Sequence, residues 1–142
     1  MLSYGVISHH AFDRKVEVGF GEDASGASPA PEILLGAHSA PLGLVFYTGT
    51  QFPTEYRGDA FVALHGSGAY DQLDGYKVVR VRFKDGAPVG GYEDFITGFS
   101  GTVKGRLAVW GTPSQLAVAR DGSLLLVDDK GACIWRVVST RK

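Results

Sequence analysis

Cysteine and methionine are nearly absent from this 142-residue chain, which contains one of each. The lone cysteine, Cys133, cannot form an internal disulfide, so the sequence does not indicate a redox compartment. An excess of one charge is also lacking, because 14 Lys and Arg residues against 15 Asp and Glu residues leave a net charge of −1. A chain without a basic face does not attract a phosphate backbone, and we expect no nucleic-acid partner.

Long apolar runs are absent as well. The first residues, Met1 to Gly5, have neither the positive charges nor the apolar stretch of a secretory signal. No segment of the sequence is long and apolar enough to cross a bilayer. As written, the sequence predicts a soluble product that stays inside the cell, with no membrane partner.

Glycine, by contrast, is frequent, with 20 residues spread among apolar, β-branched and aromatic segments. This pattern favours short strands joined by tight turns, and no segment follows a helical period. One group of strands is expected at residues 42–49, 59–66, 76–83 and 91–98. A second group of three strands is expected within residues 116–138, where Asp121-Gly122 and the segment 128–131 mark the turns.

Repeated units of four short strands indicate the blades of a β-propeller, each too small to bury its own face without a neighbour. We predict an all-β fold, a single partial β-propeller of about two to three four-stranded blades. Residues 38–100 form a complete blade and residues 101–142 an incomplete last one. Residues 1–37 supply a strand, for which Val16–Phe20 alternates, and a flexible connector. The unpaired edge of the last blade favours ring closure by homo-oligomerisation, as a dimer or a trimer.

Several motifs from His38 onward occur in the order found in one known family. They are His38-Ser-Ala-Pro-Leu-Gly-Leu44, Phe52-Pro53, Tyr56-Arg-Gly-Asp59, Leu64-His-Gly-Ser67, Gly75-Tyr-Lys-Val-Val-Arg-Val81, Gly90-Gly-Tyr-Glu-Asp-Phe95 and the block from Asp121 to Arg136. Through these motifs the chain resembles the C-terminal part of the PQQ-dependent sugar (glucose/sorbosone) dehydrogenases, a family of six-bladed β-propellers.

The resemblance implies an oxidoreductase that acts on sugar CH–OH groups with PQQ and calcium, usually outside the cytoplasm. In that family the catalytic histidine and most calcium and PQQ contacts lie in earlier blades, so no catalytic residue is assigned in this chain. The closing blades of the family contribute loops to the channel over which the quinone lies. On this basis Thr48 and His65 are assigned to cofactor binding.

The chain departs from the family in two of these loops. Gly68-Ala69-Tyr70 stands where the family has Trp, Asn and a basic residue, and Gly111-Thr-Pro-Ser-Gln115 stands where it has Gly-Arg-Pro-x-Gly. Two cationic partners for a trianionic cofactor are therefore missing. Tyr70, whose ring can stack on a sugar, and Gln115 are assigned to ligand binding.

No metal site is assigned. His9 and His10 are adjacent and would point to opposite faces of a strand, which makes a shared metal awkward. Asp128-Asp129 fits a turn, in which the side chains accept backbone N–H bonds, better than a calcium loop with its larger set of oxygen ligands. His65 ends a strand, where a role at the channel mouth and structural capping are equally compatible with the sequence.

Three functions remain open at this point. The first is a fragment or descendant of a PQQ- and calcium-dependent sugar dehydrogenase, with the activity of the isolated chain undecided. The second is a non-catalytic, self-assembling propeller module that binds a carbohydrate or another small ligand. The third and weakest is a metal-dependent lactonase-like or esterase-like propeller, which rests on analogy of fold alone.

Overall fold

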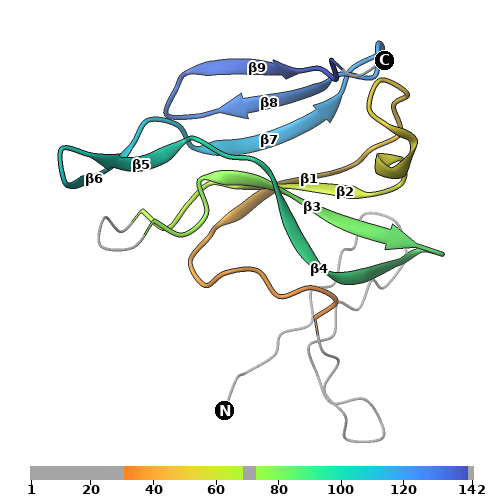
Figure 1. The fold of residues 1–142 in the computed structure, drawn as a ribbon, viewed down its shortest axis with the longest axis horizontal. Helices are drawn as coiled ribbons and strands as arrows, with labels where there is room; N and C mark the ends of the chain where they lie inside the picture. Colours follow the sequence, from red (N-terminus) through yellow and green to blue (C-terminus); the bar gives the residue numbers. More distant parts are fainter. Residues whose placement is uncertain (1–30, 69–72, 141–142) are drawn as a thin grey trace, which may run out of the picture. The chain divides into compact units, whose positions relative to one another are not determined.

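The fold was obtained as a computed structural model, which describes residues 31–68 and 73–140 (Figure 1). Its strands all belong to the compact unit Ile33–Lys142. The all-β prediction is confirmed, because the described residues contain no α-helix, and no helix among them is long and apolar enough to cross a membrane. The elements are β1 (Pro41–Phe46), η2 (Thr54–Tyr56, a 3-10 turn), β2 (Ala60–Leu64), β3 (Lys77–Lys84), β4 (Ala87–Ile96), β5 (Ser100–Val103), β6 (Arg106–Val109), β7 (Pro113–Val118), β8 (Leu124–Asp128) and β9 (Cys133–Val137).

Strands β1 to β4 form an antiparallel meander in the order β1-β2-β3-β4, which we call the first sheet. Strand β2 is buried along its whole length, as its uninterrupted apolar sequence predicts. Asp85 and Gly86 form the turn from β3 to β4, and both have the positive φ angles that a tight hairpin loop needs. The first sheet thus has the four strands expected for a complete blade.

A two-stranded hairpin, β5 with β6, follows the first sheet along the chain and has no counterpart among the strands expected from the sequence. Its turn is Lys104-Gly105, and both residues have positive φ angles. A lysine accepts this conformation at some cost, whereas glycine does so freely. The glycine between two short β-compatible segments was the local signal for this hairpin.

Strands β7, β8 and β9 form the second sheet, in that order and antiparallel. In its first turn, Oδ1 of Asp121 accepts hydrogen bonds from the backbone N and the Oγ of Ser123, at 3.0 and 2.6 Å. Gly122, the residue after Asp121, has a φ of 82°, and a Cβ atom there would lie 3.0 Å from the backbone N of Gln51, so glycine is favoured. The second sheet has the three strands expected for an incomplete blade, and among the described residues no strand pairs with the outer edge of β9.

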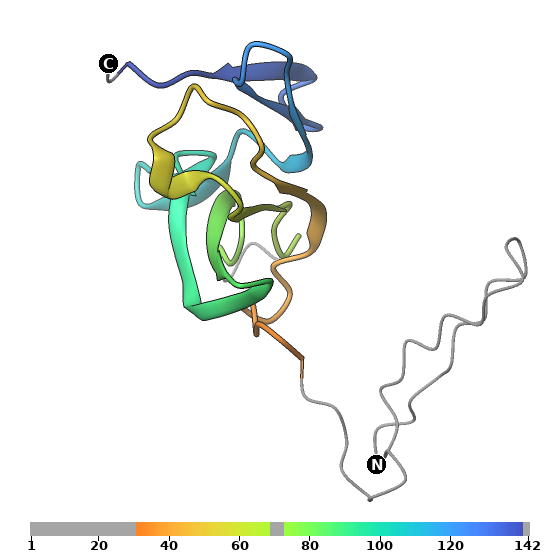
Figure 2. The same cartoon turned by 90° about the vertical axis from the view of Figure 1, so that its right-hand side faces the viewer.

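The two sheets pack face to face, with β1 against β7 (Figures 1 and 2). A Cβ atom on Gly43 would lie 2.5 Å from the carbonyl oxygen of Ser114, so this close approach of the inner strands requires glycine. The buried residues of the shared core are Tyr47, Phe52, Phe61, Ala63, Tyr76, Val78, Phe99, Leu124 and Leu126. Two sheets that cover one another's apolar face are what neighbouring propeller blades require.

Tyr47 joins the two sheets at the end where β1 finishes. Its fully buried hydroxyl donates a hydrogen bond to the carbonyl oxygen of Gly122, at 2.6 Å. The hydroxyl oxygen of Tyr47 also accepts hydrogen bonds from the backbone N–H groups of Gln51 and Phe52, at 3.1 and 3.0 Å. One side chain therefore fixes both the loop after β1 and the first turn of the second sheet.

Arg80 of β3 is buried near the same end. Its Nε donates to Oδ2 of Asp59 at 2.6 Å, and its Nη1 donates to Oε1 of Glu93 at 2.9 Å. The guanidinium also stacks over the ring of Tyr56, 4.0 Å from the ring centre. This end of the first sheet is therefore held by a polar network inside an aromatic cluster.

Candidate functional site

The opposite end of the two sheets carries His65 and the Asp128-Asp129 pair, which the sequence singles out. Strands β1, β3 and β7 begin there, and β2 and β8 finish there, because neighbouring strands are antiparallel. We call this region the His65 end, and define it by Ser39, His65, Thr112, Asp128 and Asp129. In propellers the channel opening is formed by such strand ends and the loops that follow them.

His65 follows β2 and is held by its backbone. Its N–H donates to the carbonyl oxygen of Ala40, and the N–H of Gly66 donates to that of Ser39, both at 2.9 Å. The imidazole Nε2 lies 3.7 Å from Oδ2 of Asp129, and 30% of the His65 side chain is exposed. The two residues come from different sheets, so the packing of the sheets brings them together.

Tyr76 fixes the loop after His65. The ring is buried, and its hydroxyl accepts a hydrogen bond from the N–H of Gly68 at 3.0 Å. Gly66 has a φ of 111°, and a Cβ atom there would overlap the Tyr76 ring. The position of His65 is therefore set by two glycines and a buried tyrosine, rather than by the histidine itself.

Asp128 organises the second sheet at the same end. Its Oδ1 accepts hydrogen bonds from the N–H groups of Thr112 and Gly131, at 2.8 and 2.9 Å, and its Oδ2 accepts one from the indole of Trp135 at 3.1 Å. Burial by itself raises the pKa of Asp128, but these donors, with His65 nearby, hold the pKa below its ordinary value. The turn role expected for this aspartate is thus confirmed.

Ser39 is the buried polar side chain whose hydrogen bonding stands out at the His65 end. The Oγ atom of Ser39 is buried, and no hydrogen-bond partner for it is found among the described residues. A hydroxyl left in this state costs free energy unless water or a ligand reaches it. The Ser39 hydroxyl is therefore a buried group at the His65 end that can still form a hydrogen bond with water or a ligand.

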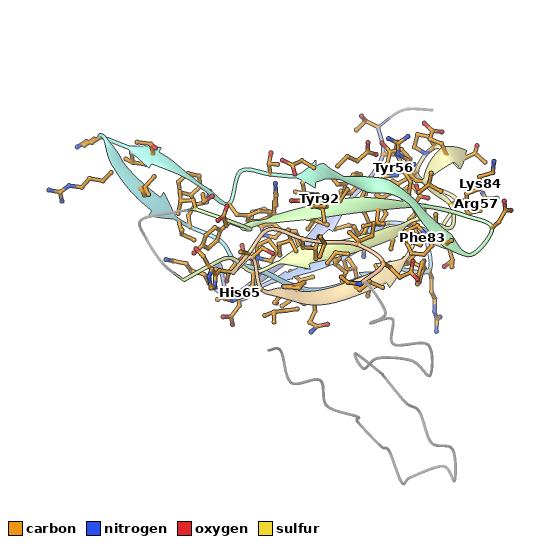
Figure 3. All side chains as sticks on the ribbon, turned by 90° about the horizontal axis from the view of Figure 1, so that it is seen from below. Tyr56, Arg57, His65, Phe83, Lys84 and Tyr92 are labelled. Atoms are coloured by element: carbon orange, nitrogen blue, oxygen red, sulfur yellow. The ribbon has the colours of Figure 1, made fainter. Side chains whose placement is uncertain are left out.

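The other assigned residues are not brought together at this end. Thr48 is exposed and follows β1, at the end of the first sheet opposite His65. Figure 3 shows His65 at one end of this sheet and Phe83 and Lys84 at the other. The six residues of β1 separate the two ends by on the order of 20 Å. Gln115 lies in β7, and its amide nitrogen donates to the carbonyl oxygen of Leu42 at 3.3 Å. Tyr70, like the His9-His10 pair, lies outside the described residues.

The described residues do not by themselves fit PQQ with calcium. A trianionic cofactor calls for several cationic donors. At this end Lys77 is already paired with Asp94 at 2.6 Å, and Lys130, whose backbone N donates to Thr112, adds one exposed lysine. Asp129 places an exposed carboxylate beside His65 instead. In the part of the chain that the structure describes, no three His, Cys, Asp or Glu residues group closely enough to hold a metal ion.

A pocket of about 760 Å³ lies between the end of β4 and the outer strands of the second sheet. Trp110 and Trp135 line it, and both are about half exposed. Their indole N–H groups donate to the carbonyl oxygen of Gly98 and to Asp128, which fixes both ring planes. The sequence shows two tryptophans but does not reveal that they share a pocket, because they lie in separate segments.

Comparisons with known proteins point to one family. Residues 11–100 match the family model described as TrAA12-like. An uncharacterised protein of Borreliella burgdorferi is 38% identical over 104 residues, which are 72% of this chain and 27% of that protein. Among solved structures, the calcium structure of a Trichoderma reesei carbohydrate-active enzyme of family AA12 is 24% identical, with a TM-score of 0.58, over 73% of this chain and 25% of that one.

The holo form of the pyranose dehydrogenase PQQ domain from Coprinopsis cinerea is 23% identical, with a TM-score of 0.60, over 82% of this chain and 30% of that one. At these identities the solved structures establish the fold, and the present chain spans between a quarter and a third of each of these relatives. The resemblance to PQQ-dependent sugar dehydrogenases is confirmed at the level of the family. On the match to more than half of its residues, the chain belongs to the TrAA12-like family.

Proposed function

We propose that this chain forms two adjacent blades of a PQQ-dependent sugar dehydrogenase-like propeller, and that the His65 end forms part of its channel wall. The observation that supports this most strongly is the distance of 3.7 Å between Nε2 of His65 and Oδ2 of Asp129, two residues that different sheets bring to one strand end. The family match and the two face-to-face sheets support the propeller context.

In this proposal the chain supplies the wall of the site and not the cradle of the cofactor. His65 presents an imidazole that donates or accepts a hydrogen bond, and Asp129 presents an exposed acceptor beside it. Such a pair suits the hydroxyl groups of a sugar. The described residues of these two blades do not supply the set of cationic donors that a quinone carboxylate needs.

The test is a binding comparison between two single variants of the full chain. PQQ with calcium, and separately a panel of aldoses, are titrated against the chain, with binding followed by calorimetry and by ligand-observed NMR. We expect weak binding that His65→Ala reduces several-fold and that Thr48→Ala leaves unchanged, because Thr48 lies at the other end. Dye reduction by the chain alone is expected to be absent.

Loss of binding in Thr48→Ala with full binding in His65→Ala would overturn this placement of the site. Sustained sugar-dependent dye reduction by the chain alone would contradict the view that these two blades lack the cofactor cradle.

The pocket beside Trp110 and Trp135 favours a second candidate, a module that binds carbohydrate without turning it over. Aromatic rings with fixed planes next to polar groups form the usual platform for a sugar ring. Trp110→Ala should then abolish aldose binding while His65→Ala leaves it unchanged. The reverse result would return the sugar to the His65 end, so the two candidates are separated by the same pair of variants.

A further inference from the structure

The two sheets repeat one another strand for strand. In the first sheet, β1 shifts its register between Pro41 and Gly43; in the second, β7 shifts between Pro113 and Gln115. The register of the ladders then relates the residues pairwise. Leu44 corresponds to Leu116, Val45 to Ala117, Phe61 to Leu125, Ala63 to Val127, Val78 to Ile134 and Arg80 to Arg136.

This correspondence identifies which faces meet inside the chain. The first sheet contributes Val45, Phe61, Ala63 and Val78 to the shared core. The second sheet contributes Leu116, Val118, Leu124 and Leu126. By the correspondence, these residues match the other face of the first sheet, the one that points away from the shared core. The contact inside the chain is therefore between two different faces, as it is between successive blades of a propeller.

Among residues 31–68 and 73–140, the outer face of the second sheet and the β1 strand of the first sheet's outer face have no partner. On the second sheet this is the tail surface, which consists of Ala117, Leu125, Val127 and Ile134 and corresponds to the buried Val45, Phe61, Ala63 and Val78. Ile134 in it is 67% exposed. A sheet face whose counterpart forms a core within the same molecule is unusual surface for a monomer.

On the first sheet the unpartnered region is the head surface, which consists of Leu42, Leu44 and Phe46 along β1. Leu44 in it is 59% exposed, although it corresponds to the core residue Leu116. Ile33 and Leu35 pack on the same side of the sheet against the residues of β2 and β3. They leave the inner strand bare, which is the strand that makes the contact inside the chain.

We propose that the tail surface of one copy of this chain packs on the head surface of the next, in a head-to-tail ring. The occupant is a second copy because each copy carries both surfaces, and together they repeat the contact that the chain already makes with itself. A heterologous contact of this kind closes into a ring when the rotation allows. Propellers have typically about 4–8 blades. Three copies with two blades each make a six-bladed ring, the number found in the family that the chain resembles. The inference rests on the fold and needs no cofactor.

The two sheets differ at one position of the inner strands, where the second sheet has Gln115 and the first sheet has Gly43. Gly43, the corresponding residue, must be glycine because its Cβ would lie 2.5 Å from the backbone of Ser114. Gln115 puts a side chain at the equivalent point of the tail surface and turns its amide toward Leu42 of its own chain. The contact between copies is therefore looser at the inner strand, and Gln115→Gly should lower the concentration for half-assembly several-fold.

The decisive experiment uses one variant for each surface. Ile134→Asp disables the tail surface and Leu44→Asp disables the head surface. Val89→Asp is the control, at an apolar residue of β4 that is 51% exposed. Native mass is measured by light scattering after size exclusion over a range of concentrations, and thermal melting confirms that each variant folds. We expect three times 15.1 kDa for the unaltered chain and for the control, and the monomer mass for each surface variant.

An equimolar mixture of the two surface variants distinguishes a head-to-tail contact from a symmetric one. The Leu44→Asp chain keeps an intact tail and the Ile134→Asp chain keeps an intact head, so the mixture should form a heterodimer and nothing larger. A mixture that stays monomeric while the unaltered chain assembles would overturn the head-to-tail scheme. A monomeric unaltered chain at every concentration would overturn self-assembly and leave these surfaces to blades of another polypeptide.

Discussion

Arg80 and Arg136 occupy the same place in the ladders of the two sheets, yet their surroundings differ. Arg80 lies opposite Phe61 in β2, and Arg136 lies opposite Leu125 in β8. The side chain of Arg80 is 8% exposed and contacts Asp59 and Glu93, whereas that of Arg136 is 54% exposed and pairs with Asp121 at 2.8 Å. An arginine in the same register is thus buried where the second sheet covers its face of the first sheet, and exposed on the second sheet, where the equivalent face is not covered.

Replacing Arg80 should break this comparison most strongly. Arg80→Ala leaves the carboxylate of Asp59 buried without its partner, which is expected to cost about 3–5 kcal/mol of unfolding free energy. Urea denaturation followed by tryptophan fluorescence measures the loss. A cost below about 1 kcal/mol would mean that water reaches Asp59 in the folded chain.

The hydrogen bond of the Tyr47 hydroxyl contributes to the attachment of the second sheet to the first. Tyr47→Phe removes the bond to Gly122 and leaves the N–H groups of Gln51 and Phe52 without an acceptor, so the expected cost is about 2 kcal/mol. The same denaturation experiment should show it, with an unchanged m-value if both sheets still unfold together. A change in m-value would indicate that the second sheet unfolds separately.

Asp128 makes the stability of the second sheet depend on pH. Its pKa in the folded chain lies below the ordinary value of 3.8, so its stabilisation is present in full above that value and is lost as the pH falls through the lower, folded-state pKa. Asp128→Asn should cost about 1–2 kcal/mol at neutral pH. It should also flatten the fall in stability below about pH 4, measured by thermal melting between pH 2 and 7. An unaltered acid profile would assign that fall to other carboxylates.

The smallest effect is expected at Arg136. Its ion pair with Asp121 is exposed, so solvent screens it and it contributes little to stability, less still at high salt. Arg136→Ala should therefore change the unfolding free energy of the monomer less than any of the three variants above, measured by the same urea denaturation. If copies assemble as proposed, Arg136 becomes covered, and the same variant should cost more at high protein concentration than at low concentration.

The strands of the fold follow from the sequence because apolar segments alternate with turns whose residues accept positive φ angles. The turn at Asp85-Gly86 illustrates this. The hairpin turned by Lys104-Gly105 escaped prediction because its strands have only four residues each and weak apolar character. Short elements of this kind depend on their surroundings more than on their own sequence.

The candidate site was only partly predictable. Thr48 and His65 each follow a strand, and the sequence gives both the appearance of a channel residue. They follow consecutive antiparallel strands, however, and antiparallel strands finish at opposite ends of a sheet. The neighbour of His65, Asp129, comes from another sheet, and no local pattern shows how two sheets are packed together. Cofactor and ligand binding by Thr48, His65, Tyr70 and Gln115 stay predictions.

The hydrogen bond from Tyr47 to Gly122 joins residues that are 75 positions apart, whereas each sheet is a meander of strands adjacent in sequence. Contacts between near neighbours form early in folding, and contacts that close a long loop form late. During synthesis the first sheet can form before the second has been made, and its apolar face then waits for the second sheet to dock. The Tyr47 hydroxyl should therefore slow unfolding and leave the folding rate almost unchanged.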